Sequence, residues 1–307
     1  MRIQSLRPAA WPVIALAIAF LAANAIGVDA QGDARERTLF VSAVDKDGAP
    51  IDGLSINDFI VREDGARREV LRVSRAIEPM DIALLVDTSA SSSDLIPQLR
   101  DGVRRFITAM LPAGVSQPHS IALVSIAARP TILVDYTSNT RPLLDGAGRL
   151  FTDRISGITL LDALVEVSRG LERREATRAV IVPVITDGIE FSNRYYRDVL
   201  EAMTRAGAGL HAVTVGTFSV SDDDAIRNRA FTLEEGPKAT GGQRKLLLTT
   251  NAVPAALDRL AAELQSQYKV VYGRPQSLIP PEKLEVSASR AGITMRAMPI
   301  RGQKPGV

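Results

Sequence analysis

The residues best suited to chemistry form the run Asp87-Thr88-Ser89-Ala90-Ser91, in which one carboxylate alternates with two serine hydroxyls. The run directly follows Ile82–Val86, a continuous apolar segment of the kind that forms a strand buried on both faces. Open α/β sheets bind their ligands at the carboxyl ends of such strands. We therefore expect these three oxygen-bearing side chains to lie at a ligand-binding edge.

A second carboxylate is predicted at the same edge. The segment Arg178–Ile185 also has the pattern of a buried strand, although Pro183 is unusual inside one, and it leads into Thr186-Asp187-Gly188. Between the two strands, a threonine stands just before a helical pattern. The candidate set is Asp87, Ser89, Ser91, Thr159 and Asp187.

All five candidate groups bind through oxygen, which is typical of a site for a hard cation. Magnesium fits this donor set best, and manganese or calcium could replace it. The two carboxylates would offset the two charges of the metal. A carboxylate from another molecule could then complete the shell, so that the metal would bridge two proteins.

The surrounding sequence predicts an α/β domain over residues 80–270, because apolar strand-like runs alternate with helical patterns. This alternation favours a mainly parallel sheet. Further strands are expected at 120–126, 131–136 and 210–215, and helices at 95–111, 160–171, 195–206 and 252–264.

Short strands are predicted on both sides of this domain. Residues 38–77 hold two Asp-Gly turn signals, at Asp47-Gly48 and Asp64-Gly65, and residues 271–300 return to strand patterns. Neither stretch is large enough to bury a core alone. We expect the two to pack together as a small flanking β unit.

Composition excludes several classes of function. The 307 residues include no cysteine, which rules out disulfides, thiolate metal sites and cysteine nucleophiles. Only two histidines are present, His119 and His211, so a multi-histidine metal site is not expected. The net charge of +2 is too balanced for a dedicated nucleic-acid binder.

Residues 1–30 have the pattern of a secretory signal peptide. Arg2 and Arg7 precede an apolar stretch, which ends at Val28-Asp29-Ala30 with small or modest residues before a possible cleavage point. The alternative is an uncleaved membrane anchor, since about 20 apolar residues can span a bilayer. Either way the rest of the chain is predicted to be extracytoplasmic, periplasmic or secreted.

The five candidate residues, in this order, resemble the metal-ion-dependent adhesion site of von Willebrand factor type A domains, whose motif is D-x-S-x-S, then a threonine, then an aspartate. The helix start at Thr159 and the turn Ala239-Thr-Gly-Gly242 are similar to the family as well. The run from Val44 to Leu54 resembles the leader of bacterial von Willebrand factor A-related proteins, which are common in acidobacteria, and Leu264–Tyr272 resembles their closing segment.

This resemblance implies a Rossmann-like fold and a non-enzymatic, metal-dependent binding role in adhesion or assembly. It implies direct metal contacts from Ser89 and Ser91 and a direct or water-bridged contact from Thr159. Asp87 and Asp187 would hold metal-bound waters and orient the serines. The expected partner is a protein that presents an Asp or Glu to the metal. Ala90 departs from a frequent glycine and could restrict the loop.

Simpler interpretations stay open. The run at Asp87 could cap the following helix, and Thr159 could form a capping box with Asp162. The metal site could only stabilise a structural scaffold. A serine hydrolase using Ser89 or Ser91 is less favoured, because the sequence has no G-x-S-x-G elbow.

Other signals also have two interpretations. The acidic runs Asp45–Asp47 and Asp222–Asp224 suggest a hairpin turn and a helix start rather than calcium loops. The pair Tyr195-Tyr196 could line a ligand surface or pack in the core.

Overall fold

A six-stranded sheet forms the centre of the computed structural model, which describes residues 34–216, 223–275, 281 and 283–298. Its strands are β5 Met80–Asp87, β6 Ser120–Ile126, β7 Pro130–Thr137, β8 Arg178–Ile185, β9 Ala208–Val215 and β10 Gln243–Leu247. They lie in the order β10-β9-β8-β5-β6-β7 and are parallel except for β7 at one edge. The β8–β9 pairing extends from Ala179–Ala208 to Ile185–Thr214 but is interrupted at Val182 and Pro183, since proline has no N–H to donate.

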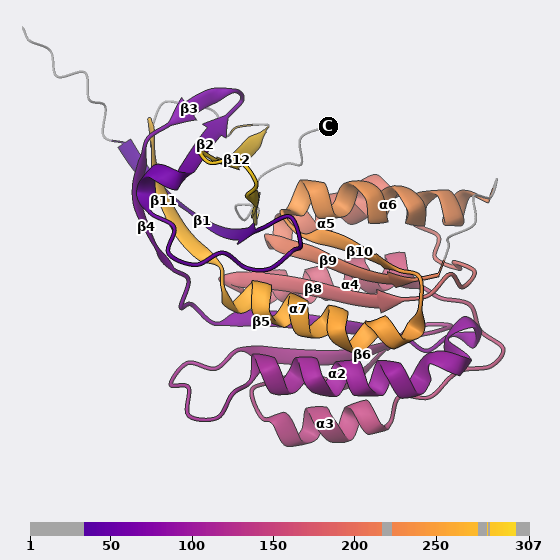
Figure 1. Ribbon diagram of the computed structural model, residues 1–307. Coiled ribbons are helices and arrows are strands. Elements are labelled where there is room, and N and C mark those ends of the chain that lie inside the picture. The colour runs from indigo at the N-terminus through magenta and orange to yellow at the C-terminus, as the bar shows by residue number, and fades with distance from the viewer. Residues whose placement is uncertain (1–33, 217–222, 276–280, 282, 299–307) are drawn as a thin grey trace, which may run out of the picture.

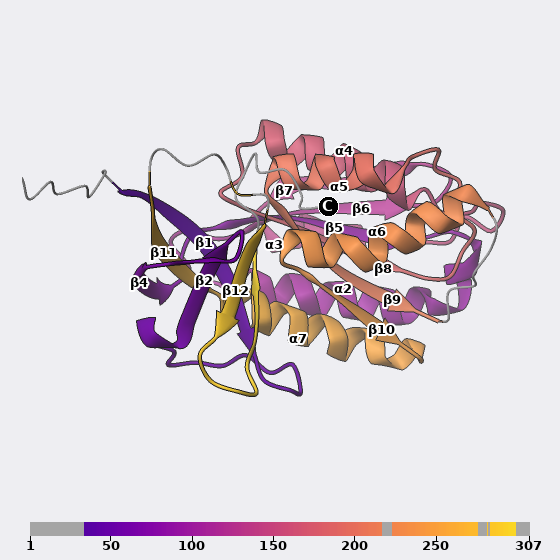
Figure 2. The same ribbon diagram turned by 90° about the horizontal axis from the view of Figure 1, so that it is seen from above.

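Helices cover both faces of this sheet (Figures 1 and 2). One face carries α2 Ile96–Met110, α3 Thr140–Gly148 and α7 Val253–Gln265, and the other carries α4 Leu160–Arg173, α5 Tyr196–Ala206 and α6 Asp224–Thr240. Alternate residues of β5 point to opposite faces, so Ile82 and Leu84 join the first core while Ala83 and Leu85 join the second. Burial on both faces explains why this strand is continuously apolar from Ile82 to Val86.

A separate β unit is built from both flanks of the chain. One sheet has the order β13-β1-β11-β4 and the other β12-β2-β3. The bounds are β1 Ala34–Val44, β2 Phe59–Glu63, β3 Ala66–Arg68, β4 Val70–Arg75, β11 Tyr268–Pro275, β12 Leu284–Ala288 and β13 Thr294–Ala297. The two sheets share an apolar core that includes Val41, Val61 and Tyr272. The described residues also form short 3-10 helices, namely η1 Ile56–Asp58, η2 Ala90–Leu95 and η3 Thr250–Ala252.

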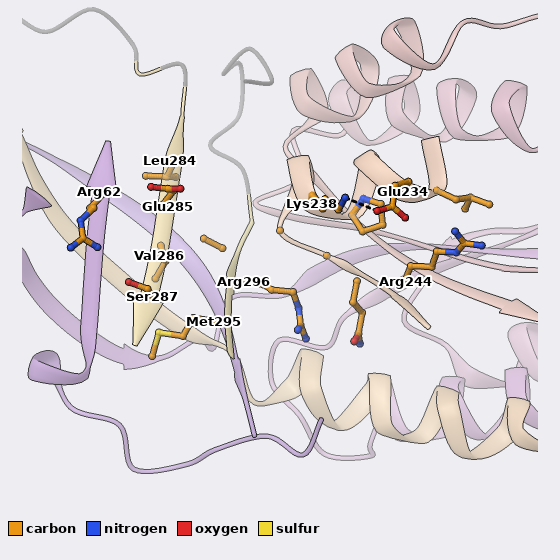
Figure 3. Close-up of a pocket in the computed structure, with 16 residues that line it drawn as sticks. Arg62, Glu234, Lys238, Arg244, Leu284, Glu285, Val286, Ser287, Met295 and Arg296 are labelled. Atoms are coloured by element: carbon orange, nitrogen blue, oxygen red, sulfur yellow. Dashed lines mark hydrogen bonds and ion pairs between the residues drawn. The ribbon is translucent and has the colours of Figure 1, made fainter. Parts of the chain in front are cut away.

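The β unit lies at the amino end of the central sheet, because β4 leads into β5 and α7 leads into β11 (Figure 1). A cleft of about 650 Å³ separates β12 and β13 from α6 and β10. Figure 3 shows the ion pair of Lys238 with Glu234 on one wall, and Arg62 and Leu284 on the other. The cleft is lined by Gln243 and Arg244, which are the first residues of the parallel strand β10. It therefore lies away from the carboxyl end of the sheet, where Asp87 is located.

The expected fold class is confirmed: a mainly parallel α/β sheet with antiparallel sheets formed by the two flanks. In the central α/β domain, α3 and β10 were not predicted, and of α6 only the start was. Helix α3 contains Pro142, Gly146 and Gly148, and α6 contains Gly236 and Pro237, all of which weaken a helical pattern. Strand β10, which reads Gln-Arg-Lys-Leu-Leu, is a polar edge strand without the apolar run of its neighbours.

Residues 1–30, predicted to be a signal peptide, lie outside the described residues, as does Asp222. Asp223 caps α6 by accepting hydrogen bonds from the N–H groups of Ala225 and Ile226, which agrees with the predicted helix start. Within the described ranges, none of the helices combines the length and the apolar character needed to cross a membrane.

The burial of His211 in β9 predicts how the stability of the fold depends on pH. Its side chain is fully buried, and burial lowers its pKa from 6.5 to about 4. The unfolded chain therefore binds a proton between pH 6.5 and 4 that the folded chain does not, so this residue costs stability as pH falls through that window. We expect His211→Met to flatten the acid dependence by about one proton, or roughly 1.4 kcal/mol per pH unit. Urea unfolding of both chains at pH 6.5 and 4.5 measures this difference, and parallel losses would contradict it.

Candidate metal site

The carboxylate of Asp87 is the centre of the candidate site. It is fully buried at the end of β5 and accepts hydrogen bonds on both oxygens. Oδ1 accepts from the N–H and the hydroxyl of Ser89, at 2.8 and 2.6 Å. Oδ2 accepts from the N–H and the hydroxyl of Thr186, at 2.9 and 2.5 Å. Asp87 therefore joins the loop after β5 to the loop after β8.

Three hydroxyls continue this network toward solvent. The Ser89 and Ser91 hydroxyls lie 3.0 Å apart, and the Ser91 hydroxyl lies 2.5 Å from that of Thr186. Ser89 is buried, whereas Ser91 is exposed. The structure thus brings the carboxylate and both serines of the predicted motif together, and it adds Thr186, which sequence analysis had not assigned as a candidate ligand.

Gly188 packs closely against the hydroxyls of Ser89 and Ser91. A Cβ at this position would lie 2.5 Å from Ser91 Oγ and 3.1 Å from Ser89 Oγ. The neighbouring Asp187 is exposed, and its carboxylate faces Gly216, where a Cβ would lie 3.7 Å from Oδ2. The second predicted carboxylate is therefore at the same edge of the sheet, on the solvent side of the hydroxyl cluster.

Thr159 lies at the start of α4 but makes a different contact. Its hydroxyl donates to the carbonyl of Ala127 at 3.0 Å, in the loop after β6. Its side chain makes no capping hydrogen bond to α4, so the capping box proposed with Asp162 is wrong. The reason is that Ser192 takes its place: the N–H of Asp162 donates to the Ser192 hydroxyl at 3.0 Å.

Two buried charges beneath the site were missed by sequence analysis. Arg229 of α6 is 2% exposed and donates to the carbonyl of Gly188. Burial lowers its pKa, while the negative charges of Glu190, Asp87 and Asp187 oppose that shift. Glu190 is also buried, and burial raises its pKa to about 7. No local signal in the sequence links Arg229 to a loop 41 residues away.

The residues fit a small hard cation in the nature of their donors and in their packing. One carboxylate, that of Asp87, and the three hydroxyls of Ser89, Ser91 and Thr186 converge, and the missing side chain of Gly188 leaves the serine hydroxyls room. The described residues contain no cluster of three or more His, Cys, Asp or Glu side chains able to hold a metal. Any metal here would therefore depend on hydroxyl ligands.

Both histidines lie away from the serines. His119 accepts a hydrogen bond from the N–H of Met80, at the amino end of β5, and His211 is buried within β9. Neither is placed to take a proton from Ser89 or Ser91, which stand beyond the carboxyl end of β5. The hydrolase alternative therefore has no histidine base.

Residues 82–190 match the family model of the von Willebrand factor type A domain. The matched stretch begins in β5 and includes all five candidate residues. This match covers 109 of the 307 residues, so it assigns a von Willebrand factor type A domain to residues 82–190 and not to the chain as a whole. A search of curated proteins found no significant match.

Several solved structures have a similar arrangement. Proximal thread matrix protein 1 from the mussel byssus, solved with a zinc-occupied MIDAS motif, is 15% identical over 66% of this chain and 50% of that chain, with a TM-score of 0.50. The von Willebrand factor domain of the pilus tip protein Mfa5 from Porphyromonas gingivalis is 14% identical over 62% and 96% of the two chains, with a TM-score of 0.47. BatB from Bacteroides thetaiotaomicron is 12% identical over 61% and 100%, with a TM-score of 0.46. The byssus match shows a shared fold, and this chain spans half of that protein.

Proposed function

We propose that this chain is an extracytoplasmic protein-binding module whose contact with its partner depends on a bound divalent metal. Ser89 and Ser91 would hold the ion directly, with Thr159 direct or bridged by water, while Asp87 and Asp187 would orient the serines and bound waters. Magnesium is the expected ion, with manganese or calcium as substitutes. An Asp or Glu of the partner would complete the shell, in adhesion or in assembly.

The observation that carries this proposal is the convergence of two loops on one carboxylate. Asp87 holds the Ser89 hydroxyl on one oxygen and the Thr186 hydroxyl on the other, so oxygen donors from β5 and β8 meet at one point. Their position at the carboxyl ends of parallel strands is the usual ligand-binding place in open α/β sheets. The zinc-occupied motif of the byssus protein, which shares the fold, supports a metal-binding role here.

The extracytoplasmic location rests on the signal-like pattern of residues 1–30. A chain without cysteine is suited to an oxidising compartment, because it has no thiol to protect. The mass of the mature protein tests this part: an amino terminus at Gln31 supports cleavage, and an intact amino terminus supports a membrane anchor.

Calorimetric titration of Mg²⁺ into the chelator-treated full chain tests the metal site. We expect saturable binding that falls about 10-fold or more in Ser91→Ala, since even outer-shell partners of a metal contribute about 10–100-fold. Ser93→Ala is the matched control, because Ser93 lies in the same loop but donates to the carbonyl of Ala90. Binding that is equal in the two variants would contradict the assignment.

The scaffold alternative predicts a different result when melting temperature and peptide capture are measured with and without Mg²⁺. If the metal only stabilises the fold, Mg²⁺ should raise the melting temperature of the wild-type chain without creating any metal-dependent capture of an acidic peptide. Saturable Mg²⁺ binding together with chelator-sensitive peptide capture would favour the binding module.

A further inference from the structure

Large hydrophobic side chains are exposed around the candidate metal site. Twelve such side chains are exposed in the described part of the chain, and five of them come from the two loops that flank the site. The five are Phe151, Ile155, Ile189, Phe191 and Tyr195, which we call the apolar rim. Because single exposed hydrophobic residues are normal but concentrated ones mark interaction sites, this distribution indicates a docking surface.

Backbone hydrogen bonds fix both loops against the site. The N–H of Ile158 donates to the carbonyl of Ile189, and the N–H of Phe191 donates back to that of Ile158, both at 2.8 Å. The first loop is also tied to the D-x-S-x-S run, since the N–H of Asp153 donates to the carbonyl of Thr88 at 2.8 Å. The rim and the proposed ligands therefore form one connected surface.

Phe191 is held in place although its side chain is largely in solvent. A Cβ on Gly157 would lie 2.7 and 2.8 Å from two of its ring atoms, so the ring packs on bare backbone. The residue is nonetheless 59% exposed. One side of the ring is thus anchored and the rest is free, which lowers the entropy cost of burying it against a partner.

The charges indicate what kind of polar group the rim surrounds. With a divalent cation bound, the charges of Asp87 and Asp187 offset those of the metal, and the charges of the buried Arg229 and Glu190 oppose each other, so the site would have one open metal position for a partner's oxygen and no excess charge to attract several acids. A single anionic group is therefore favoured at the centre. The exposed loop residues around it include both Asp153 and Arg154, which does not favour a run of acids.

We infer that the partner segment carries one carboxylate flanked on both sides by large apolar side chains, the carboxylate reaching the metal and the flanks packing on the apolar rim. This inference rests on the proposed function and adds the chemistry of the partner to it. The expected occupant of the apolar rim is a segment of another protein rather than a second copy of this chain.

Four synthetic peptides test this inference on the full chain in excess Mg²⁺. One has a central Asp flanked on each side by Leu and Phe, a second has the same Asp flanked by serines, and the other two carry Asn in place of Asp. We expect the apolar Asp peptide to bind about 10-fold or more tightly than each of the others, as measured by fluorescence anisotropy, since burying one large apolar side chain is worth about 1.5–3 kcal/mol.

Single substitutions in the apolar rim show which side chains contact the flanks of the peptide. Ile155→Ser and Phe191→Ser should each weaken the apolar Asp peptide about 10-fold while Mg²⁺ binding is unchanged. Ile77→Ser is the matched control, because Ile77 is 80% exposed, compared with 95% for Ile155, but precedes the amino end of β5. Its affinity for the peptide should equal that of the wild type.

The outcomes separate the two proposals. Equal binding of both Asp peptides, with Mg²⁺ still required, would overturn the apolar flanks and leave the proposed function standing. Equal binding of the apolar Asp and Asn peptides would overturn the link between rim and metal. Absence of Mg²⁺ binding would overturn the proposed function itself. Self-association that is lost in Ile155→Ser, measured by sedimentation, would show that a second copy occupies the rim and would overturn the inference.

Discussion

Replacing Asp87 with asparagine is expected to abolish Mg²⁺ binding and to lower the free energy of unfolding by about 3 kcal/mol. The buried carboxylate accepts two hydrogen bonds on each oxygen, from Ser89 and Thr186. An asparagine amide has one oxygen, so its NH₂ group must face one of the two backbone N–H donors. A buried donor left without an acceptor costs about 1–3 kcal/mol, and the opposed NH₂ group adds its own unsatisfied hydrogens.

Urea unfolding and calorimetric titration measure the two effects on the same sample. Asp45→Asn is the matched control, because Asp45 Oδ1 also accepts from two backbone N–H groups, those of Asp47 and Ala49, but lies in an exposed turn. We expect it to cost less than about 1 kcal/mol, since water can replace a lost partner there. A loss in Asp87→Asn no larger than in the control would show that the buried network does not form in solution.

Strands β5 and β8 could be predicted from sequence because burial on both faces leaves a continuous apolar run, and because the residues that follow them are polar. That reasoning placed Asp87, Ser89, Ser91 and Asp187 at one edge of the sheet. It could not decide which hydroxyls meet, because a side-chain rotation moves a hydroxyl between alternatives that the sequence does not distinguish. Thus Thr186 rather than Thr159 donates to Asp87.

The missed features share a physical cause. Helix α6 carries Arg229, the buried cation beneath the site, yet its pattern is weakened by Gly236 and Pro237 near its end. The helix survives because tertiary packing supplies what propensity lacks: Leu233 is fully buried in the second core. A contact between a poorly predicted helix and a distant loop leaves no local signal. The position of the buried Arg229 therefore required the structure.

The substitution Gly188→Ala is expected to weaken Mg²⁺ binding while leaving the free energy of unfolding almost unchanged. The new Cβ would lie 2.5 Å from Ser91 Oγ and 3.1 Å from Ser89 Oγ, so the Ser91 hydroxyl must turn away, whereas that of Ser89 need only shift by a few tenths of an ångström. One proposed ligand would be displaced without being removed, and we expect the affinity for Mg²⁺ to fall about 10-fold or more. Stability should change by less than about 1 kcal/mol, because the exposed Ser91 side chain can rotate and the buried Ser89 hydroxyl can keep its hydrogen bond to Asp87.

Gly170→Ala is the control for this substitution, since a Cβ there meets nothing within 4 Å on helix α4. It should leave Mg²⁺ affinity unchanged and stabilise the helix slightly, because alanine has the higher helix propensity. Calorimetric titration of the two alanine variants beside the wild type makes the comparison. If Gly188→Ala kept its affinity to within about 3-fold, the ion could not lie where the Ser89 and Ser91 hydroxyls meet, and the proposed ligand set would have to be abandoned even though the fold is correct.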